Sequence, residues 1–423
     1  MITGLRAQNF KSWRDTGDLR IAPLTGLFGT NSSGKSSILQ TVLLLRQTRS
    51  SADPGRVLNL GGDETAAIDL GTFTDILHDH DSSAVLELSI SWKPEPRLPS
   101  NPGPWCPPLA FSLAVQEVEN RIQILRFSYS DRLACEVKIT RRPDGTYEST
   151  SATLGSPKTP VQVSAPIDWD HRSMTEHDAF WVAFSLQNEL SQVRYLGPLR
   201  YGPKRAPYLW AGSKPRDAGR AGELAVQALL ASRTENRSVE VDVARSLERL
   251  GLAYSFRLEQ IAPNRRDYEV RIKTSERSTE VLLTDVGFGI SQVLPILVLC
   301  HFAPENSILI LEQPEIHLHP AAQSELADVL MDIVAKRKVQ IIFESHSEHL
   351  LRRIQRRIAE EKFSANDAAL YFCEMQGGES KATPLEITED GFIKNWPTNF
   401  FGDEMGDLSA MTEAAAKRRL VSK

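Results

Sequence analysis

Hydrophobic residues in the last third of the chain follow two patterns. Short runs with a single polar residue each occur at 307–311 and 339–343, and between them, over 321–337, apolar residues recur at helical spacing. Short, mostly apolar runs are typical of buried strands, whereas the recurring pattern is typical of an amphipathic helix. A strand, a helix and a second strand in this order predict a mainly parallel sheet covered by helices.

The start of the chain predicts a strand, loop and helix unit. Residues 1–13 and 18–29 have the pattern of short strands that lead into a glycine-rich loop, and 36–48 has the leucine spacing of a buried helix. Between 85 and 92, apolar residues largely alternate with polar ones, which indicates a half-buried strand.

The region from 93 to 165 has a different texture. Prolines are dense over 93–108, where each one removes a backbone donor, so we expect an exposed loop. Antiparallel strands are expected from about 109 to 165, with a hairpin turn at 143–145. The sequence between residues 29 and 308 has no sustained heptad pattern, so no long coiled coil is expected.

These patterns predict an α/β chain of five segments. They are an N-terminal lobe (1–92), an antiparallel β part (93–165), an inserted helical and loop region (166–280), a C-terminal lobe (281–402) and a tail (403–423).

Composition excludes several classes of protein. With 41% hydrophobic and 24% charged residues, the 423-residue chain has the composition of an ordinary globular protein. No apolar run is long enough to span a bilayer, so we expect a cytoplasmic protein without membrane contact. The cysteines at 106, 135, 300 and 373 have neither metal-ligand nor redox spacing. We interpret them as buried or incidental thiols.

The charge distribution leaves nucleic-acid binding open only for a local patch, because the net charge is −5. Arginines cluster at 352–357 on a predicted helix. They are the solvated face of a packed helix or a contact to a phosphate backbone, and the sequence allows both. The last ten residues form a basic segment that we expect to be a frayed tail.

The segment GTNSSGKS, residues 29–36, has the pattern of a phosphate loop. Glycines let successive backbone amides point at phosphate groups, Lys35 can reach the β- and γ-phosphates, and Ser36 can ligate magnesium. A strand precedes this segment and a helix follows it, as a phosphate loop requires. The sequence therefore predicts a nucleotide site.

Three later segments add candidate chemistry. TDVGFGISQVLP (284–295) places Gly287 and Gly289 before a helix that opens with Ser291 and Gln292, an arrangement suited to an anion. ILILEQPEIHLHP (308–320) delivers carboxylates to the end of a buried strand, where ligands of open α/β sheets bind. IIFESHSEHLL (341–351) ends the next strand at His346.

Taken together, GTNSSGKS, VGFGISQ, LILEQPEIHLHP and ESHS resemble the ABC-type AAA ATPases of the RecF, SMC and OLD group. The phrases LRAQNFKSW, YLGPLR, SEHLLRRIQRRIA and GFIKNWPTNFF resemble compact stand-alone bacterial ATPases of the anti-phage defence kind, such as the Septu ATPase PtuA. This likeness covers the chain from Ile2 to about Phe401. It implies an ABC-type P-loop ATPase head with an antiparallel β subdomain and a helical insertion.

The resemblance also implies roles for residues. Magnesium would be held by Ser36 and Glu312, with Gln313 at the usual position of the catalytic base and His346 as the switch residue. Ser291, with Gly289, would reach ATP bound to a second subunit, so ATP would join a head-to-head homodimer that controls a separate effector such as a nuclease. The triphosphate would contact the following phosphate-loop residues: Gly29, Asn31, Ser32, Ser33, Gly34, Lys35, Ser36 and Ser37.

The departure at Gln313 predicts slow hydrolysis. Glutamine can orient a water molecule but cannot accept its proton. Glu315 and Glu344 are carboxylates close enough in sequence to be the base instead, and the sequence leaves that choice open.

Two other functions are weighed against the switch. A RecF-like DNA-repair ATPase is the alternative, and an OLD-type nuclease is disfavoured because only about seventy residues follow His346 and they lack the carboxylate set of a Toprim domain. His317 and His319 could share one face as metal ligands, but no third ligand accompanies them, so we expect them to anchor a loop.

Overall fold

A computed structural model describes the chain except residues 52, 54–55, 63–65, 94–107, 132–135, 154–155, 158–160, 164–185, 211, 213, 236–238, 399, 403 and 422–423. The proline-rich loop expected at 93–108 therefore lies almost wholly outside the described residues. So do Cys106 and Cys135, whereas Cys300 and Cys373 are buried free thiols, as interpreted from the sequence.

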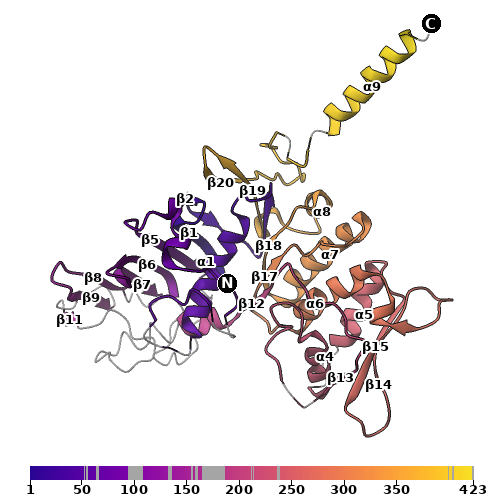
Figure 1. The fold of residues 1–423 in the computed structure, drawn as a ribbon, viewed down its shortest axis with the longest axis horizontal. Helices are drawn as coiled ribbons and strands as arrows, with labels where there is room; N and C mark the ends of the chain where they lie inside the picture. The colour runs from indigo at the N-terminus through magenta and orange to yellow at the C-terminus, as the bar shows by residue number, and fades with distance from the viewer. Residues whose placement is uncertain are drawn as a thin grey trace.

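A six-stranded sheet forms the centre of the molecule (Figure 1). Its strands, in spatial order, are β12 (Val193–Leu196), β17 (Ile308–Glu312), β18 (Gln340–Glu344), β4 (Leu24–Gly29), β19 (Ala368–Gln376) and β20 (Glu379–Pro384). The first five are parallel and β20 is antiparallel. Strands β4, β17 and β18 are buried along their whole length, which explains their largely apolar sequences.

Helices cover this sheet. They include α1 (Lys35–Arg49), α6 (Phe288–Phe302), α7 (Pro320–Arg337) and α8 (Glu348–Ala359). Side chains of α6, α7 and α8 share one core cluster with β4 and β17, while those of α1 belong to a second cluster with β12. The five parallel strands thus have apolar cover from two clusters, and their carboxyl ends meet at one edge of the sheet.

A ten-stranded antiparallel sheet lies beside the central sheet. Its strands are β1 (Ile2–Phe10), β2 (Trp13–Asp15), β3 (Leu19–Arg20), β5 (Leu86–Trp92), β6 (Pro108–Val118), β7 (Arg121–Asp131), β8 (Glu136–Arg141), β9 (Tyr147–Thr153), β10 (Ser156–Pro157) and β11 (Val161–Val163). Burial in β5 alternates, as its sequence predicts. Gly145 lies in the turn between β8 and β9 with φ 85°, so the expected hairpin is confirmed.

A smaller sheet and two helices lie on the opposite side of the central sheet (Figure 1). They are β13 (Tyr208–Leu209), β14 (Ser255–Gln260), β15 (Asp267–Lys273), β16 (Val281–Leu282), α4 (Ala225–Thr234) and α5 (Val239–Arg249). Short helices occur at α2 (Phe73–Ile76), η1 (His78–His80), η2 (Leu283–Asp285) and η3 (Ala365–Asp367). The α/β fold with antiparallel and helical additions is therefore confirmed, while the five-segment division of the chain stays a prediction.

The last helix, α9 (Glu404–Val421), extends away from the body of the molecule (Figure 1). At 18 residues it equals α7 in length, and no longer helix occurs within the described residues. The expected absence of a long coiled coil thus holds for this part of the chain. None of the described helices is both long and apolar enough to cross a membrane.

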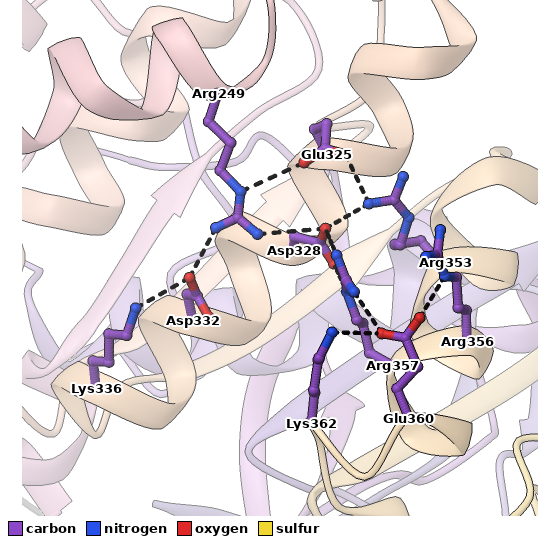
Figure 2. A network of polar contacts seen from close by, with 10 residues as sticks. All are labelled: Arg249, Glu325, Asp328, Asp332, Lys336, Arg353, Arg356, Arg357, Glu360 and Lys362. Carbon is purple, nitrogen blue, oxygen red and sulfur yellow. Dashed lines mark hydrogen bonds and ion pairs between the residues drawn. The ribbon is translucent and has the colours of Figure 1, made fainter.

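The arginines of α8 are held in ion pairs (Figure 2). Asp328 of α7, 2% exposed, contacts Arg353 at 2.5 Å and Arg357 at 2.6 Å. Arg352 pairs with Glu348, and Arg356 pairs with Glu360. These contacts favour the packed helix over a phosphate contact, because each guanidinium already has a carboxylate partner.

Candidate functional site

The phosphate loop joins β4 to α1 at the carboxyl edge of the central sheet. At Gly29 φ is 135°, and an added Cβ would lie 1.9 Å from the Cys373 carbonyl oxygen of β19. At Gly34 φ is 81°, and the Gly34 carbonyl accepts a hydrogen bond from Trp13 Nε1 at 2.9 Å. Both glycines are required by close packing and a left-handed backbone, and they fix the curl of the loop.

Lys35 lies inside this curl. Its Nζ donates to the carbonyl oxygens of Gly29 at 3.1 Å and Thr30 at 2.6 Å, and to Ser33 Oγ at 3.3 Å. Burial lowers the pKa of Lys35, and Glu344 opposes that effect. The ammonium group is thus held among acceptors that phosphate oxygens could replace.

Two carboxylates lie side by side next to the loop. Glu312 ends β17, Glu344 ends β18, and the two residues are register partners in the parallel ladder. Ser36 Oγ donates to Glu344 Oε2 at 2.6 Å, whereas Glu312 Oε1 accepts from the Tyr195 hydroxyl at 2.8 Å. Ser36, predicted to share magnesium with Glu312, is therefore in direct contact with Glu344.

The side chain of Glu312 is buried. Burial raises its pKa to about 7, the Tyr195 hydrogen bond opposes the rise, and the charge of Glu344 adds to it. A cation placed between the two carboxylates would reverse this effect by favouring both ionised forms.

Gln313 and Glu315 have different surroundings. Gln313 has φ 45°, and its backbone N–H donates to the Glu344 backbone carbonyl at 2.9 Å. Gln313 lines the pocket at the phosphate loop, whereas Glu315 does not. Glu315 is 7% exposed and its Oε1 accepts from the His346 amide at 2.8 Å, while its Oε2 has no partner in the described residues. Burial raises the pKa of Glu315.

Arg200, the last residue of YLGPLR, forms hydrogen bonds to the backbone at the end of β17. Its Nη2 donates to the carbonyl oxygens of Glu312 at 2.7 Å and Gln313 at 3.1 Å. Burial lowers the pKa of Arg200 to about 10, against the charges of Glu315 and Glu312. Sequence reasoning noted the phrase but assigned no role to Arg200. Its signal was an arginine four residues after a short buried strand.

His346 follows β18, is exposed and lines the same pocket. Burial of part of its ring and the charge of Lys35 lower its pKa. The pocket encloses about 280 Å³ and is lined by Ser12, Asn31, Ser32, Ser33, Gly34, Lys35, Ser36, Ser37, Gln313, Glu344 and His346. The structure thus brings the predicted loop residues from Asn31 to Ser37 together with Gln313, His346 and Glu344, whereas Gly29 and Glu312 do not line the pocket.

The predicted signature residues lie apart from this pocket. Ser291 Oγ donates to the Phe288 carbonyl at 2.7 Å within the first turn of α6, and both Ser291 and Gln292 are buried. A Cβ added to Gly289 would lie 2.7 Å from the His317 carbonyl oxygen, so this loop packs against the segment that follows β17. Phe288 between the two glycines is 53% exposed.

His317 and His319 have local contacts. The His317 ring lies edge-on to Phe288 with 4.9 Å between ring centroids, and His319 caps α7 by accepting from the Ala321 amide at 3.3 Å. No group of three potential metal ligands of the His, Cys, Asp and Glu types occurs in the described part of the chain.

The donor set still fits magnesium. The hydroxyl of Ser36 and the carboxylates of Glu344 and Glu312 are hard oxygen donors, and Mg²⁺ takes few protein ligands because it keeps several waters and phosphate oxygens. When bound with ATP, the ion would neutralise charge on the β- and γ-phosphates.

Comparison with known protein families agrees with this geometry. Residues 215–352 match a family described as "AAA domain, putative AbiEii toxin, Type IV TA system". Residues 364–411 match a family described as "Protein of unknown function (DUF3696)". No curated protein matches the chain.

Solved structures similar to this chain are heads of SMC proteins. An SMC head bound to the C-terminal winged-helix domain of ScpA shares 14% identity, with 92% of this chain and 98% of that chain covered and a TM-score of 0.48. The SMC head domain from Thermotoga maritima shares 14% identity (91% and 99% covered, TM-score 0.40). An SMC head with an extended coiled coil, bound to the C-terminal domain of ScpA derived from Pyrococcus furiosus, shares 12% identity (91% and 96% covered, TM-score 0.44).

These TM-scores are below 0.5, so the fold assignment rests on the chain itself. A parallel sheet, a phosphate-loop pocket and strand-end carboxylates thus occur in a chain of which residues 215–352 match an AAA domain family.

Proposed function

We propose that this protein binds ATP with magnesium in the phosphate-loop pocket, hydrolyses it slowly, and acts as an ATP-driven dimeric switch for a separate effector. The observation that carries the proposal is the convergence of Lys35, the pair Ser36 and Glu344, Gln313 and His346 on one pocket. Phosphoryl transfer needs mainly positioning and charge neutralisation, which these groups supply.

Slow turnover is expected because a glutamine, Gln313, stands in the pocket at the usual position of the catalytic base. Gln313 lines the pocket and can orient a water molecule without accepting a proton. Glu315, the nearby carboxylate, is engaged with the His346 amide instead. The ATP-bound state should therefore persist before hydrolysis.

The dimer is supported by the position of the signature loop. Gly287, Gly289 and Ser291 do not line the chain's own phosphate-loop pocket, so a second subunit is needed for them to contact phosphate. Phe288, an exposed aromatic residue at this loop, would be covered in such a dimer.

The effector role is supported by the family that matches residues 215–352, whose description names a toxin system. We propose that the effector, such as a nuclease, is encoded separately and acts in anti-phage defence. The RecF-like alternative, in which DNA is the partner, is less favoured because the α8 arginines are already paired with carboxylates.

Light scattering with and without Mg²⁺ and ATP tests the switch. The wild-type protein should dimerise with ATP, Phe288→Asp should stay monomeric, and Phe392→Asp, which changes an exposed phenylalanine elsewhere, should behave as wild type. A wild-type protein that binds ATP yet stays monomeric would overturn the dimer.

Identifying the effector requires purification of the protein from its host with ATP present. A nuclease or toxin that co-elutes with the wild type and not with Lys35→Ala would support the effector role. DNA that stimulates hydrolysis with a steep salt dependence would support the RecF-like alternative instead.

A further inference from the structure

A second cavity lies beside β12, the edge strand of the central sheet. It encloses about 690 Å³, within the range of small-molecule sites. Its walls come from the last turn of α1 at Arg46, from the loop 201–209, from the start of α4 and from α6 at Ser291, Leu294 and Pro295. The residues that line this cavity do not line the phosphate-loop pocket.

Positive charge is concentrated around this cavity. Arg46 Nη2 lies 3.9 Å from Asp217 Oδ2, and the charges of Asp217 and Arg216 act on Arg46 and on Arg194. Arg220 and Lys204 also line the cavity. The lining therefore holds three cationic side chains, Arg46, Lys204 and Arg220, and two acidic ones, Asp217 and Glu223.

The two carboxylates balance only two of the three positive charges of the lining. Asp217 Oδ1 accepts from the Gly219 amide at 2.9 Å, and Glu223 Oε2 accepts from the Ala221 amide at 2.8 Å, so each is partly engaged by backbone. Burial lowers the pKa of Arg46 and of Arg194, and for both the charge of Arg216 lowers it further. Partly buried like charges are costly unless an anion joins them.

The lining also offers groups that could contact a planar ring. Tyr201 is 62% exposed and Leu209 is 63% exposed, which leaves an aromatic and an apolar side chain without cover in the described structure. Gln227 Oε1 is buried and has no hydrogen-bond partner there. An amide acceptor and an exposed tyrosine are groups that recognise a nucleobase.

From these contacts we infer that the cavity beside β12 binds a phosphate-bearing nucleotide, with Arg46, Arg220 and Lys204 at the phosphate and Tyr201 against the base. This site is separate from the phosphate loop, because the two pockets share no lining residue.

A ligand here would contact parts that also build the ATP site. Tyr195 lines the cavity and donates its hydroxyl to Glu312, and Ser291 of the lining belongs to the signature helix. This step rests on the proposed ATPase function: a ligand in the cavity then regulates ATP binding or hydrolysis at the phosphate loop. Binding itself does not depend on hydrolysis.

Calorimetric titration of Lys35→Ala protein tests the site, because that variant disables the phosphate loop. The probes are ADP, AMP and pyrophosphate. We expect ADP to bind the Lys35→Ala protein, and Arg220→Glu in the same background to weaken binding about ten-fold or more, as expected for loss of a charged contact. Arg277→Glu, the same charge change at an exposed arginine outside the lining, is the control.

The probes separate the two halves of the site. Tyr201→Ala should weaken ADP and leave pyrophosphate unchanged, whereas Arg220→Glu should weaken both. Failure of all three probes to bind, or ADP binding that Arg220→Glu leaves unchanged, would overturn the inference. Should Lys35→Ala protein not fold, titration of the wild-type chain gives the same answer, with two ADP sites expected, one of which weakens about ten-fold or more in Arg220→Glu.

The outcome is distinguishable from failure of the proposed function. The phosphate-loop assignment is tested in Arg220→Glu protein, by comparing ATP binding with and without the Lys35→Ala change. Equal ATP binding by these two proteins would contradict the phosphate-loop assignment. The ADP titrations of Lys35→Ala protein test only the cavity beside β12.

Discussion

Ser36 Oγ donates a hydrogen bond of 2.6 Å to Glu344 Oε2, which joins the first turn of α1 to the end of β18 across 308 residues of sequence. This contact places a carboxylate beside the hydroxyl that phosphate loops use for magnesium. Glu312, the carboxylate expected there from the motif, is hydrogen-bonded to Tyr195.

Glu344→Gln should raise the magnesium concentration needed for half-maximal ATP hydrolysis by about ten-fold, because an amide replaces a charged oxygen donor near the ion. Glu348→Gln, four residues along in α8, should leave that concentration unchanged. The measurement is phosphate release as a function of magnesium. An unchanged requirement in Glu344→Gln would remove Glu344 from the magnesium site.

Gln313→Glu should speed turnover by about ten-fold or more, because it adds a carboxylate that can act as general base, whereas Glu344, the carboxylate already in the pocket, accepts a hydrogen bond from Ser36. Single-turnover hydrolysis with saturating ATP reports this step. Glu315→Gln should have little effect, since its Oε1 can still accept from the His346 amide. If Gln313→Glu leaves the rate unchanged and Glu315→Gln abolishes it, Glu315 is the base and the role given to Gln313 is wrong.

Asp328→Ala should lower the free energy of unfolding by about 1.5–3 kcal/mol, because half-buried Arg353 and Arg357 lose the buried carboxylate that they share and keep only Glu325 and Glu360. Asp328 contacts Arg353 and Arg357 of α8, and Arg249 of α5 lies 3.4 Å away (Figure 2). Although burial acts to raise its pKa, Arg357 and Arg353 hold the pKa of Asp328 below its ordinary value. Urea unfolding measures the loss.

Lys336→Ala is the matched control in the same helix. Lys336 pairs with Asp332 but its side chain is 73% exposed, so the change should cost about 0–1 kcal/mol. Equal destabilisation by the two variants would show that the network around Asp328 is not a buried anchor between helices.

His301 should make stability fall as the solution becomes more acidic. Burial lowers its pKa to about 4, and its Nε2 lies 2.9 Å from Ser246 Oγ of α5. The unfolded chain takes up a proton near pH 6.5 while the folded chain stays neutral, so this contribution is full above pH 6.5 and is lost as the pH falls towards 4.

Thermal unfolding between pH 7.5 and 4 measures this effect, since His301→Gln cannot titrate. The wild type should lose roughly 2–3 kcal/mol more than His301→Gln over that interval, less if solvent reaches the ring. Parallel stability curves for the two proteins would show that His301 is protonated equally in both states.

The sequence predicted the parts of the nucleotide site that each motif carries by itself. Lys35 and His346 lie in one pocket because the strands that precede them are parallel and end at one edge of the sheet, which the strand and helix pattern implies. Strand order is not written in the local pattern, however. That β18 lies between β17 and β4 decides that Glu344, rather than Glu312, contacts Ser36.

Long-range polar contacts were likewise beyond the sequence. Arg200 reaches the carbonyls of Glu312 and Gln313 across 112 and 113 residues, and no periodicity marks such a pair. The α8 arginines showed the opposite case, because their charge was visible while their partner Asp328 was not.

Phosphate release from ATP in the presence of magnesium tests the central claim most directly. Wild-type protein and Lys336→Ala should release phosphate slowly but measurably, and Lys35→Ala should lower the rate by about a hundred-fold or more, because it removes the cation that the transferred phosphoryl group needs. No release by the wild type, or undiminished release by Lys35→Ala, would contradict an ATPase built on this phosphate loop.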